Sequence, residues 1–483
     1  MNLLVIPAIP LLAALLSAVA PGRRGAPAVT LAGAAATLAL AVWAAARVAA
    51  EGPLISIAGW VEIDGLSALV LLVVAFVAAM AALFSWGYLA AHDYAPRRVR
   101  RYGLHFNLFV FALVLVPVLA EPALVWMAVE FTAVFSVLLV GFDDTPEALE
   151  AAWKYIALMF MGAAIALLGI FVLFWAQAAA GGGHYSWAAL REIAPQLPPG
   201  LVVAAFLFIL VGFGTKAGLV PMHTWLPDAH SQAPSPVCAL LSGVKTVTVL
   251  YTILRLVPLL PAEDLGGWMQ AIGLVSVGTA AFLLLQVRDY KRLFAYSTVE
   301  HMGIIVVAVG FGTQLGAYGA MLQIVSHAVT KSLCFFAAGS ALLLVGTREI
   351  ASVRGLLRTS PLVGTSLLFG ALAIGGAPPM AVFLSEFAII RAGLARGAYL
   401  TTALLVGFIA VAFAGILLHV NRMVFGAPPA AETTAPPHAL PFTCALTLVL
   451  GAIPVLVLGV YQPVPLHALM TQAAAALAPV VVP

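Results

Sequence analysis

The feature that most constrains this chain is its series of long apolar stretches, which are separated by short charged or Pro/Gly-rich breaks. A helix that spans a bilayer needs about 20 apolar residues. Roughly fourteen such stretches occupy most of the 483 residues, 63% of which are hydrophobic and only 8% charged. Soluble domains are about 25% charged, so a soluble enzyme is excluded. We expect an all-α integral membrane protein with about fourteen transmembrane helices, at 3–20, 27–50, 65–91, 104–120, 122–141, 151–178, 200–217, 236–259, 266–286, 294–312, 315–346, 361–394, 398–424 and 440–460.

The two ends of the chain fit the same pattern. No positively charged segment precedes the first apolar stretch, so residues 3–20 are interpreted as a span rather than a cleavable signal. The segment from Pro463 to Pro483 is expected to form a short, weakly amphipathic helix.

Basic residues are divided unevenly between the loops. Fourteen of the 22 Lys and Arg residues lie in loops after odd-numbered spans, and five lie in or beside even-numbered loops. The other three, Lys216, Lys245 and Lys331, lie within apolar stretches. Cytoplasmic loops hold an excess of Lys and Arg. We therefore expect a bacterial inner-membrane protein with cytoplasmic odd-numbered loops and both termini outside.

Two segments interrupt the helical pattern at membrane depth. The first runs from Gly212 to Pro236, and the second, at 375–379, contains Pro378 and Pro379. Proline removes a backbone donor and clashes with the preceding helical turn. Non-helical backbone at this depth survives only when it is buried in protein or lines a wet cavity. We expect broken helices at the seventh and twelfth positions.

The spacing of ionisable residues favours an inverted repeat. Glu130 and Lys216 are 86 residues apart, and His301 and Glu386 are 85 residues apart. Paired broken helices in corresponding halves are typical of inverted-repeat transporters. Four parts are expected: helices 1–3 in 1–100, the first half of the repeat (helices 4–8) in 101–260, the second half (helices 9–13) in 261–425, and helix 14 with the tail in 426–483.

Ionisable side chains inside the apolar stretches are the candidate functional residues. A charge at the bilayer centre costs at least ~2.5–3.5 kcal/mol. The presence of several such charges in one chain therefore requires an explanation. We interpret them as a proton-transfer chain at mid-membrane. Structural ion pairs and snorkelling side chains are the alternatives, and interfacial placement is a further one for His301, which follows a charged loop. The set is Glu130, Lys216, Lys245, His301, His327, Lys331 and Glu386.

Six other residues are interpreted as shaping the breaks: Pro221, His223, Asp228, His230, Pro378 and Pro379. The three cysteines are isolated, so no iron–sulfur cluster or structural zinc is expected in this chain. Haem held by His301 and His327 is disfavoured because each has a charged neighbour within four residues. No phosphate-binding loop is present, and no run of basic and aromatic residues suggests nucleic acid.

Five motifs resemble the antiporter-like subunits of respiratory complex I, Mrp cation/proton antiporters and membrane-bound hydrogenases, with the hydrogenase-4 component F type most similar. The resemblance covers roughly residues 65–425. Its motifs are Glu150–Tyr155 (EAAWKY), Gly214–His230 (GTKAGLVPMHTWLPDAH), Tyr296–Gly303 (YSTVEHMG), His327–Phe336 (HAVTKSLCFF) and Pro378–Phe387 (PPMAVFLSEF).

The resemblance implies roles for the candidate residues. It pairs Glu130 with Lys216, matches Lys245 to the helix-eight lysine, and makes Glu386 the terminal residue on broken helix twelve. It gives His301, His327 and Lys331 the central positions. The resemblance further implies that this chain holds no redox centre. Iron–sulfur clusters or a nickel–iron site would lie in peripheral hydrogenase-like or formate dehydrogenase-like partner subunits. Other antiporter-like subunits and anchor subunits would be its partners in the membrane. Unlike in the distal complex I subunit, we expect no long lateral helix after span fourteen.

The function that these residues lead us to expect is proton translocation driven by redox chemistry in partner subunits. A lysine–carboxylate pair at ~4 Å and an effective dielectric constant of ~20 is worth about 4 kcal/mol, so separating it would change the protonation equilibrium about a thousandfold. A Na⁺/H⁺ antiporter subunit without redox coupling and a passive membrane anchor remain open. Glutamate and lysine sites serve H⁺ or Na⁺ equally, so the ion, electron donor and direction of coupling are undecided.

Overall fold

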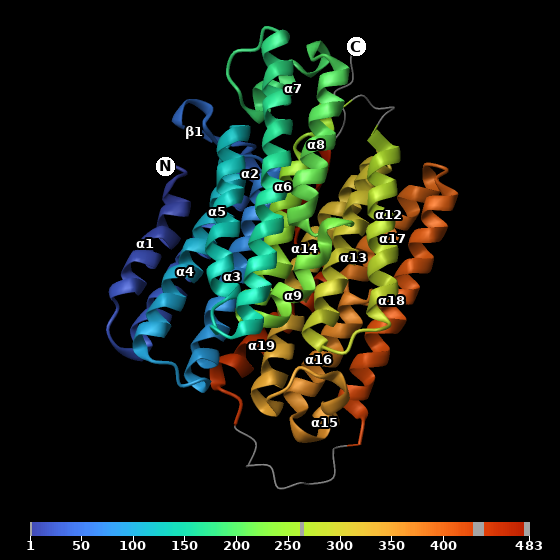
Figure 1. The fold of residues 1–483 in the computed structure, drawn as a ribbon. Helices are drawn as coiled ribbons and strands as arrows, with labels where there is room; N and C mark the ends of the chain where they lie inside the picture. The colour runs from blue at the N-terminus through green and yellow to red at the C-terminus, as the bar shows by residue number, and fades with distance from the viewer. Residues whose placement is uncertain (1, 261–264, 428–438, 478–483) are drawn as a thin grey trace.

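The computed structural model describes residues 2–260, 265–427 and 439–477, which form a bundle of long, mostly antiparallel helices (Figure 1). The first half of the described chain contains α1 (Val5–Val19), α2 (Gly22–Glu51), α3 (Gly65–Ala91), α4 (Pro96–Leu115), α5 (Pro122–Val140), α6 (Pro146–Ala179), α7 (Trp187–Glu192), α8 (Pro199–Ala217), α9 (Trp225–Gln232), α10 (Ser235–Leu240) and α11 (Thr246–Leu254). The second half contains α12 (Leu265–Leu284), α13 (Tyr290–Gly310), α14 (Gln314–Val345), α15 (Leu356–Thr359), α16 (Pro361–Ile374), α17 (Ala381–Ala395), α18 (Tyr399–Phe425), α19 (Phe442–Val460) and α20 (Val464–Ala475).

The strands of the described residues are β1 (Leu54–Ser56) and β2 (Val61–Ile63), which pair as a small antiparallel hairpin between α2 and α3. This hairpin and α7 lie at one end of the bundle, and α15 lies at the other (Figure 1). The all-α membrane fold predicted from hydropathy is therefore confirmed.

Twelve helical segments of the described chain are long and apolar enough to cross a membrane. Two shorter apolar helices, α1 and α16, occupy the expected first and twelfth positions. Fourteen crossings therefore remain a prediction for α1 and for the α16–α17 pair. Two expected features fall on residues outside those described. They are the domain boundary at 260–261 and the end of the tail helix at 478–483. The tail is helical over Val464–Ala475.

Several helices begin earlier than hydropathy predicts. Four arginines expected in a loop, within 97–101, lie in the first turns of α4, which starts at Pro96. Lys291 and Arg292 likewise lie in α13, where Asp289 caps the helix by accepting from both backbone amides. Proline and Asp at these starts satisfy or replace orphan N–H groups. The charged turns extend beyond the apolar stretch because their side chains need no hydrocarbon around them.

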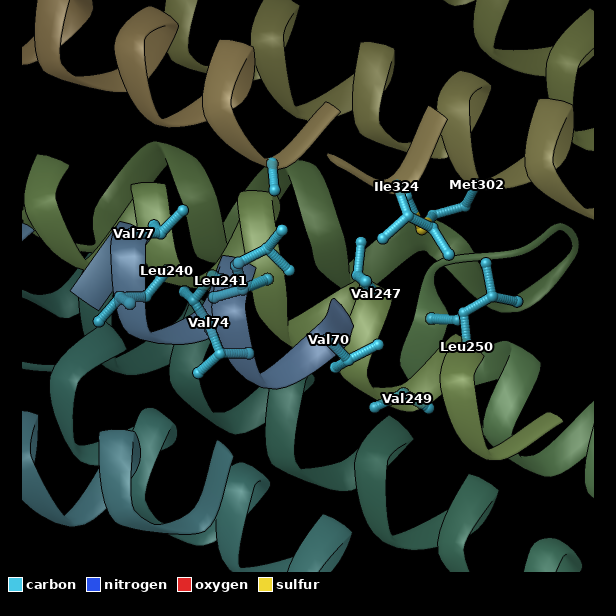
Figure 2. Close-up of a cluster of buried hydrophobic side chains, with 14 of the residues drawn as sticks. Val70, Val74, Val77, Leu240, Leu241, Val247, Val249, Leu250, Met302 and Ile324 are labelled. Carbon is cyan, nitrogen blue, oxygen red and sulfur yellow. The ribbon is translucent and has the colours of Figure 1, made fainter. Parts of the chain in front are cut away.

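The centre of the bundle is built from α3, α10–α11, α13 and α14. The run Ser235–Leu259 is buried along its whole apolar window. Figure 2 shows Val70, Val74 and Val77 of α3 beside Leu240 and Leu241 of the neighbouring run. This packing buries the interior, so a polar side chain placed there needs hydrogen-bond partners.

Candidate functional site

The first broken helix consists of two pieces, α8 and α9, with a short irregular segment between them. Gly218 takes a left-handed conformation with φ of 85°, and Leu219 N donates to Gly214 O at 2.8 Å, which closes the end of α8. A 3₁₀ turn, η4 (Met222–Thr224), leads into α9. The break is thus narrower than the 212–236 expected from sequence, because most of that segment is helical. Lys216 lies in the last turn of α8, where the helix dipole favours a cation.

Lys216 contacts Glu130 of α5. Its Nζ lies 2.5 Å from Glu130 Oε1. The lysine side chain is fully buried and the glutamate is 13% exposed. Glu130 Oε2 is buried and has no hydrogen-bond partner among the described residues. The pair that the resemblance implies therefore forms a direct ion-pair contact at membrane depth.

Lys245 lies in a π-helical turn, η5 (Leu241–Lys245), between α10 and α11. Its Nζ sits 4.7 Å from the ring centre of Tyr155 and 4.3 Å from that of Trp225, and 3.2 Å from Met159 Sδ. No carboxylate oxygen of the described residues lies within 4.0 Å of it. Aromatic faces attract a desolvated ammonium group electrostatically, so this cage accommodates a proton-carrying lysine without a counter-charge.

The cage is connected to the Glu130 helix. Tyr155 Oη lies 2.5 Å from Ser136 Oγ of α5, and Trp225 Nε1 donates to Thr215 O at 2.8 Å. Trp225 belongs to α9, directly after the break. The break thereby positions one wall of the Lys245 cage.

The two central histidines bond to the main chain. His327 Nε2 donates to Ser242 O at 3.1 Å, within the π-helical turn, and its Nδ1 has no partner among the described residues. His301 Nε2 donates to Ile374 O at 3.0 Å, at the end of α16. The ring centres lie 5.2 Å apart, and both side chains are fully buried. His301 thus lies in the protein interior, three helical turns after the start of α13 at Tyr290, rather than in the charged turn itself.

A glutamine connects the histidines to the second broken helix. Gln323 Nε2 donates to His301 Nδ1 at 2.5 Å, and Gln323 Oε1 accepts from Ser385 Oγ. The next residue, Glu386, is 6% exposed and lies against Gly376, where a β-carbon would collide with the carboxylate. Gly376 adopts φ of 77°, in the left-handed region. Glycine at this position therefore provides both the turn and the room for Glu386.

Lys331 is also fully buried. Its Nζ donates to Phe294 O at 2.7 Å and to Ser297 Oγ, and no carboxylate oxygen of the described chain lies within 4.0 Å.

The residues expected to shape the breaks fall into two groups. Pro221 and His223 lie at the first break, where His223 Nδ1 is 3.2 Å from Pro221 O, and Pro378 and Pro379 lie at the second. Asp228 and His230 lie beyond the first break, in helix α9.

Asp228 lies at the edge of the bundle and pairs with Arg292 at 2.7 Å and Lys154 at 3.6 Å. His230 is buried, and its Nδ1 donates to Leu226 O at 2.6 Å. Asp228 therefore joins α9 to α6 and α13, whereas the bond of His230 lies within α9 itself.

Several polar partners were not singled out from the sequence. Ser, Gln, Tyr and Trp give little signal against an apolar background, because they occur singly in many membrane helices; for Tyr155, Trp225 and Ser385 the signal was their place inside the quoted motifs. The residues concerned are Ser136, Tyr155, Trp225, Ser242, Gln323 and Ser385. A buried ion pair between Asp64 and Arg255 was also missed, since both lie at the ends of apolar stretches.

That ion pair lies at the end of the bundle near the hairpin. Asp64 Oδ1 and Oδ2 accept from the two terminal nitrogens of Arg255 at 2.7 and 2.5 Å. Asp64 Oδ1 also caps α3 by accepting from Ser67 N at 2.9 Å. Burial would raise the pKa of Asp64, but the Arg255 guanidinium outweighs it and holds that pKa at about 2.

These buried polar side chains form a series through the middle of the bundle, from the Glu130–Lys216 pair to the Lys245 cage, the two histidines, Gln323 and Ser385. Glu386 follows Ser385 on α17 and lies against Gly376. Side chains of the Glu, Lys and His types can donate and accept protons. No cluster of three or more His, Cys, Asp or Glu side chains within the described ranges could hold a metal ion.

Comparison with known proteins agrees with this geometry. Residues 121–413 match the family described as NADH:quinone oxidoreductase/Mrp antiporter, transmembrane, and residues 55–100 match the N-terminal family of chain 5 of complex I. The chain is 38% identical to a hydrogenase-4 component F homolog of Methylacidiphilum infernorum over 83% of this chain and 85% of that protein. It is 30% identical to NADH-quinone oxidoreductase subunit N of Desulforudis audaxviator, over 82% and 80%.

The fold is similar to a chain in the archaeal membrane-bound sulfane sulfur reductase, a respiratory membrane complex. The TM-score is 0.86 at 26% identity, over 99% of this chain and 97% of that one. The family match covers more than half of the sequence and includes both broken helices. This chain is therefore a member of the NADH:quinone oxidoreductase/Mrp antiporter transmembrane family.

Proposed function

We propose that protons cross this subunit along the buried series from Glu130 and Lys216, through Lys245 and the histidines, to Glu386. The chain is a proton-translocating membrane subunit of a hydrogenase- or complex I-like oxidoreductase, as its relatives indicate. The observation that carries the proposed route is the 2.5 Å contact between Lys216 and Glu130, at one end of the series of buried polar side chains.

The physical basis is the coupling between the two charges. At 2.5 Å and an effective dielectric constant of ~20, the attraction between them is about 7 kcal/mol. A change in partner subunits that separates the pair weakens the hold of Lys216 on its proton. The proton then moves to the next acceptor, and closing the pair again recharges the lysine. Because neighbouring sites interact, protonation belongs to the whole series rather than to one residue.

We further propose how the subunit sits in its complex. Structural neighbours belong to multi-subunit membrane complexes, so this chain packs beside other membrane subunits. Antiporter-like and anchor subunits are the proposed neighbours, with peripheral hydrogenase-like or formate dehydrogenase-like proteins holding iron–sulfur clusters or a nickel–iron site. The basic turns at the α15 end are proposed to face the cytoplasm of a bacterial inner membrane, with both termini outside.

The arrangement of helices also supports dividing the chain as an inverted repeat. The broken pair α8–α9 follows α6 in the first proposed half, and the broken pair α16–α17 follows α14 in the second. In each half the second helix contributes an ionisable residue, Glu130 on α5 and His301 on α13.

The experiment uses inside-out vesicles that contain the complete native complex. Proton uptake per electron transferred is compared between wild type and Lys216→Ala, with assembly checked by co-purification of the subunits. We expect the variant to assemble and transfer electrons while proton uptake falls. Normal proton uptake would overturn the proposed route. The family also includes Mrp antiporters, so the same vesicles are tested for Na⁺-dependent uptake without electron donor, which would favour Na⁺/H⁺ exchange.

A further inference from the structure

Glu300 is a buried carboxylate that the route described above leaves unused. It lies on α13, is 3% exposed, and is adjacent in sequence to His301. Its Oε2 atom is buried and accepts no hydrogen bond from the described residues. Leaving such an oxygen unpaired costs free energy, and native proteins retain few of these groups outside functional sites.

Lys331 is the complementary case. Its ammonium group is completely buried and is held by Phe294 O and Ser297 Oγ, both neutral acceptors. Lys216, by contrast, contacts a carboxylate directly. A buried cation held only by neutral groups is less stabilised than one with a counter-charge. Lys331 therefore has reason to exchange its proton with a nearby acid.

The positions of residues along α13 bring Glu300 close to Lys331. Both acceptors of Lys331 are on α13, and Ser297 precedes Glu300 by three residues, so the two side chains lie on the same face. Helix α13, which carries Glu300, packs against both α14, which carries Lys331, and α17, which carries Glu386. Glu300 is thus on the helix that contacts both partners.

We propose that Glu300 is a proton-exchanging group that connects Lys331 to Glu386 beside the histidine–glutamine series. The Lys331 ammonium gives its proton through an intervening water molecule to the Glu300 carboxylate, which leaves a neutral amine and a carboxylic acid. The acid then passes the proton, again through water, to the Glu386 carboxylate and regains its negative charge. One proton moves and no electron changes place. This inference rests on the proposed function and adds a second branch to it.

The test compares Glu300→Gln, Glu300→Asp and the exposed control Glu192→Gln in vesicles that hold the complete complex. We expect Glu300→Gln to lower proton uptake per electron at least tenfold, Glu300→Asp to stay within about threefold of wild type, and the control to be unchanged. Difference infrared spectra during turnover give a readout that a purely structural role would not move. A carboxylic-acid band that shifts in D₂O is expected in wild type, shifted in Glu300→Asp and absent in Glu300→Gln.

The outcomes separate the two proposals. Unchanged proton uptake in Glu300→Gln, together with loss of uptake in Lys216→Ala, overturns only the role of Glu300. Unchanged uptake in both variants removes the proposed function itself. If Glu300→Gln fails to assemble, the infrared spectrum of Glu300→Asp decides, because a band identical to wild type would show that Glu300 is not the exchanging acid.

Discussion

Replacing Glu130 with glutamine tests the charge coupling at the start of the series. The substitution keeps the size of the side chain and removes its charge. The lost attraction is about 7 kcal/mol at 2.5 Å and an effective dielectric constant of ~20. The glutamine oxygen still accepts a hydrogen bond from Lys216, which returns about 1.5–3 kcal/mol. The net loss for the charged lysine is then roughly 4–5 kcal/mol.

A free-energy loss of this size is large enough to stop proton transfer to Lys216. Each 1.36 kcal/mol changes a rate or equilibrium tenfold, so protonation of Lys216 becomes about a thousandfold less favourable. Electron transfer takes place in other subunits and does not use this lysine. We therefore expect Glu130→Gln to keep electron transfer while proton translocation through this subunit becomes undetectable.

The assay is the ratio of protons to electrons in vesicles, measured with a pH-sensitive dye and an independent assay of the electron donor. Glu147→Gln is the matched control, because it makes the same change at an exposed position at the start of α6. Glu130→Asp keeps the charge and is expected to retain part of the activity. A normal proton-to-electron ratio in Glu130→Gln would refute the coupling argument.

Two further predictions concern stability and the lysine cage. Asp64 has a folded-state pKa of about 2 against an ordinary 3.8, so its pairing with Arg255 contributes roughly 2.5 kcal/mol above pH 4, and this is lost as pH falls through 2. Asp64→Asn should lower the thermal unfolding temperature at pH 7 but not at pH 2. Asp93→Asn, in an exposed ion pair, should change that temperature little at either pH. Equal changes in unfolding temperature for the two variants at pH 7 would contradict this prediction. Trp225→Leu removes one face of the cage around Lys245, worth about 1–2 kcal/mol, and should slow proton translocation roughly tenfold. Trp225→Phe keeps an aromatic face and should slow proton translocation less than Trp225→Leu. Equal slowing in the two variants would show that the aromatic ring does not stabilise the charged Lys245.

The sequence was sufficient to find the charged members of the series. A lone Glu130 or Lys216 in an apolar stretch stands out because its cost at the bilayer centre demands an explanation. The breaks were equally visible, since Gly and Pro at membrane depth have few other uses. The pairing of Glu130 with Lys216 came from the family resemblance and not from the residues themselves, because residues 86 apart can share a site only if the helices pack in one particular order.

The neutral members could not be found in this way. Gln323 joins His301 to Ser385, yet nothing in its apolar surroundings distinguishes it from any other glutamine on a helix. The π-helical turn at Leu241–Lys245 left no recognisable signal either. Helix starts were misplaced because hydropathy reports the hydrocarbon region, whereas α4 and α13 continue beyond it into charged turns.

The hydrogen bonds from His301 to Ile374 O and from His327 to Ser242 O have a consequence for how mutations act on this protein. A carbonyl oxygen only accepts, so each ring carries its hydrogen on Nε2. Nδ1 of His327 has no partner among the described residues and can accept a proton, whereas Nδ1 of His301 already accepts from Gln323 Nε2. The two carbonyl groups that specify the tautomers are main-chain atoms, which no side-chain substitution removes. Alanine scanning would miss these determinants, and random point mutation would rarely disturb them. Insertion or deletion of one residue near either irregular turn would move the carbonyl away, so this part of the subunit should tolerate changes of residue far better than changes of length.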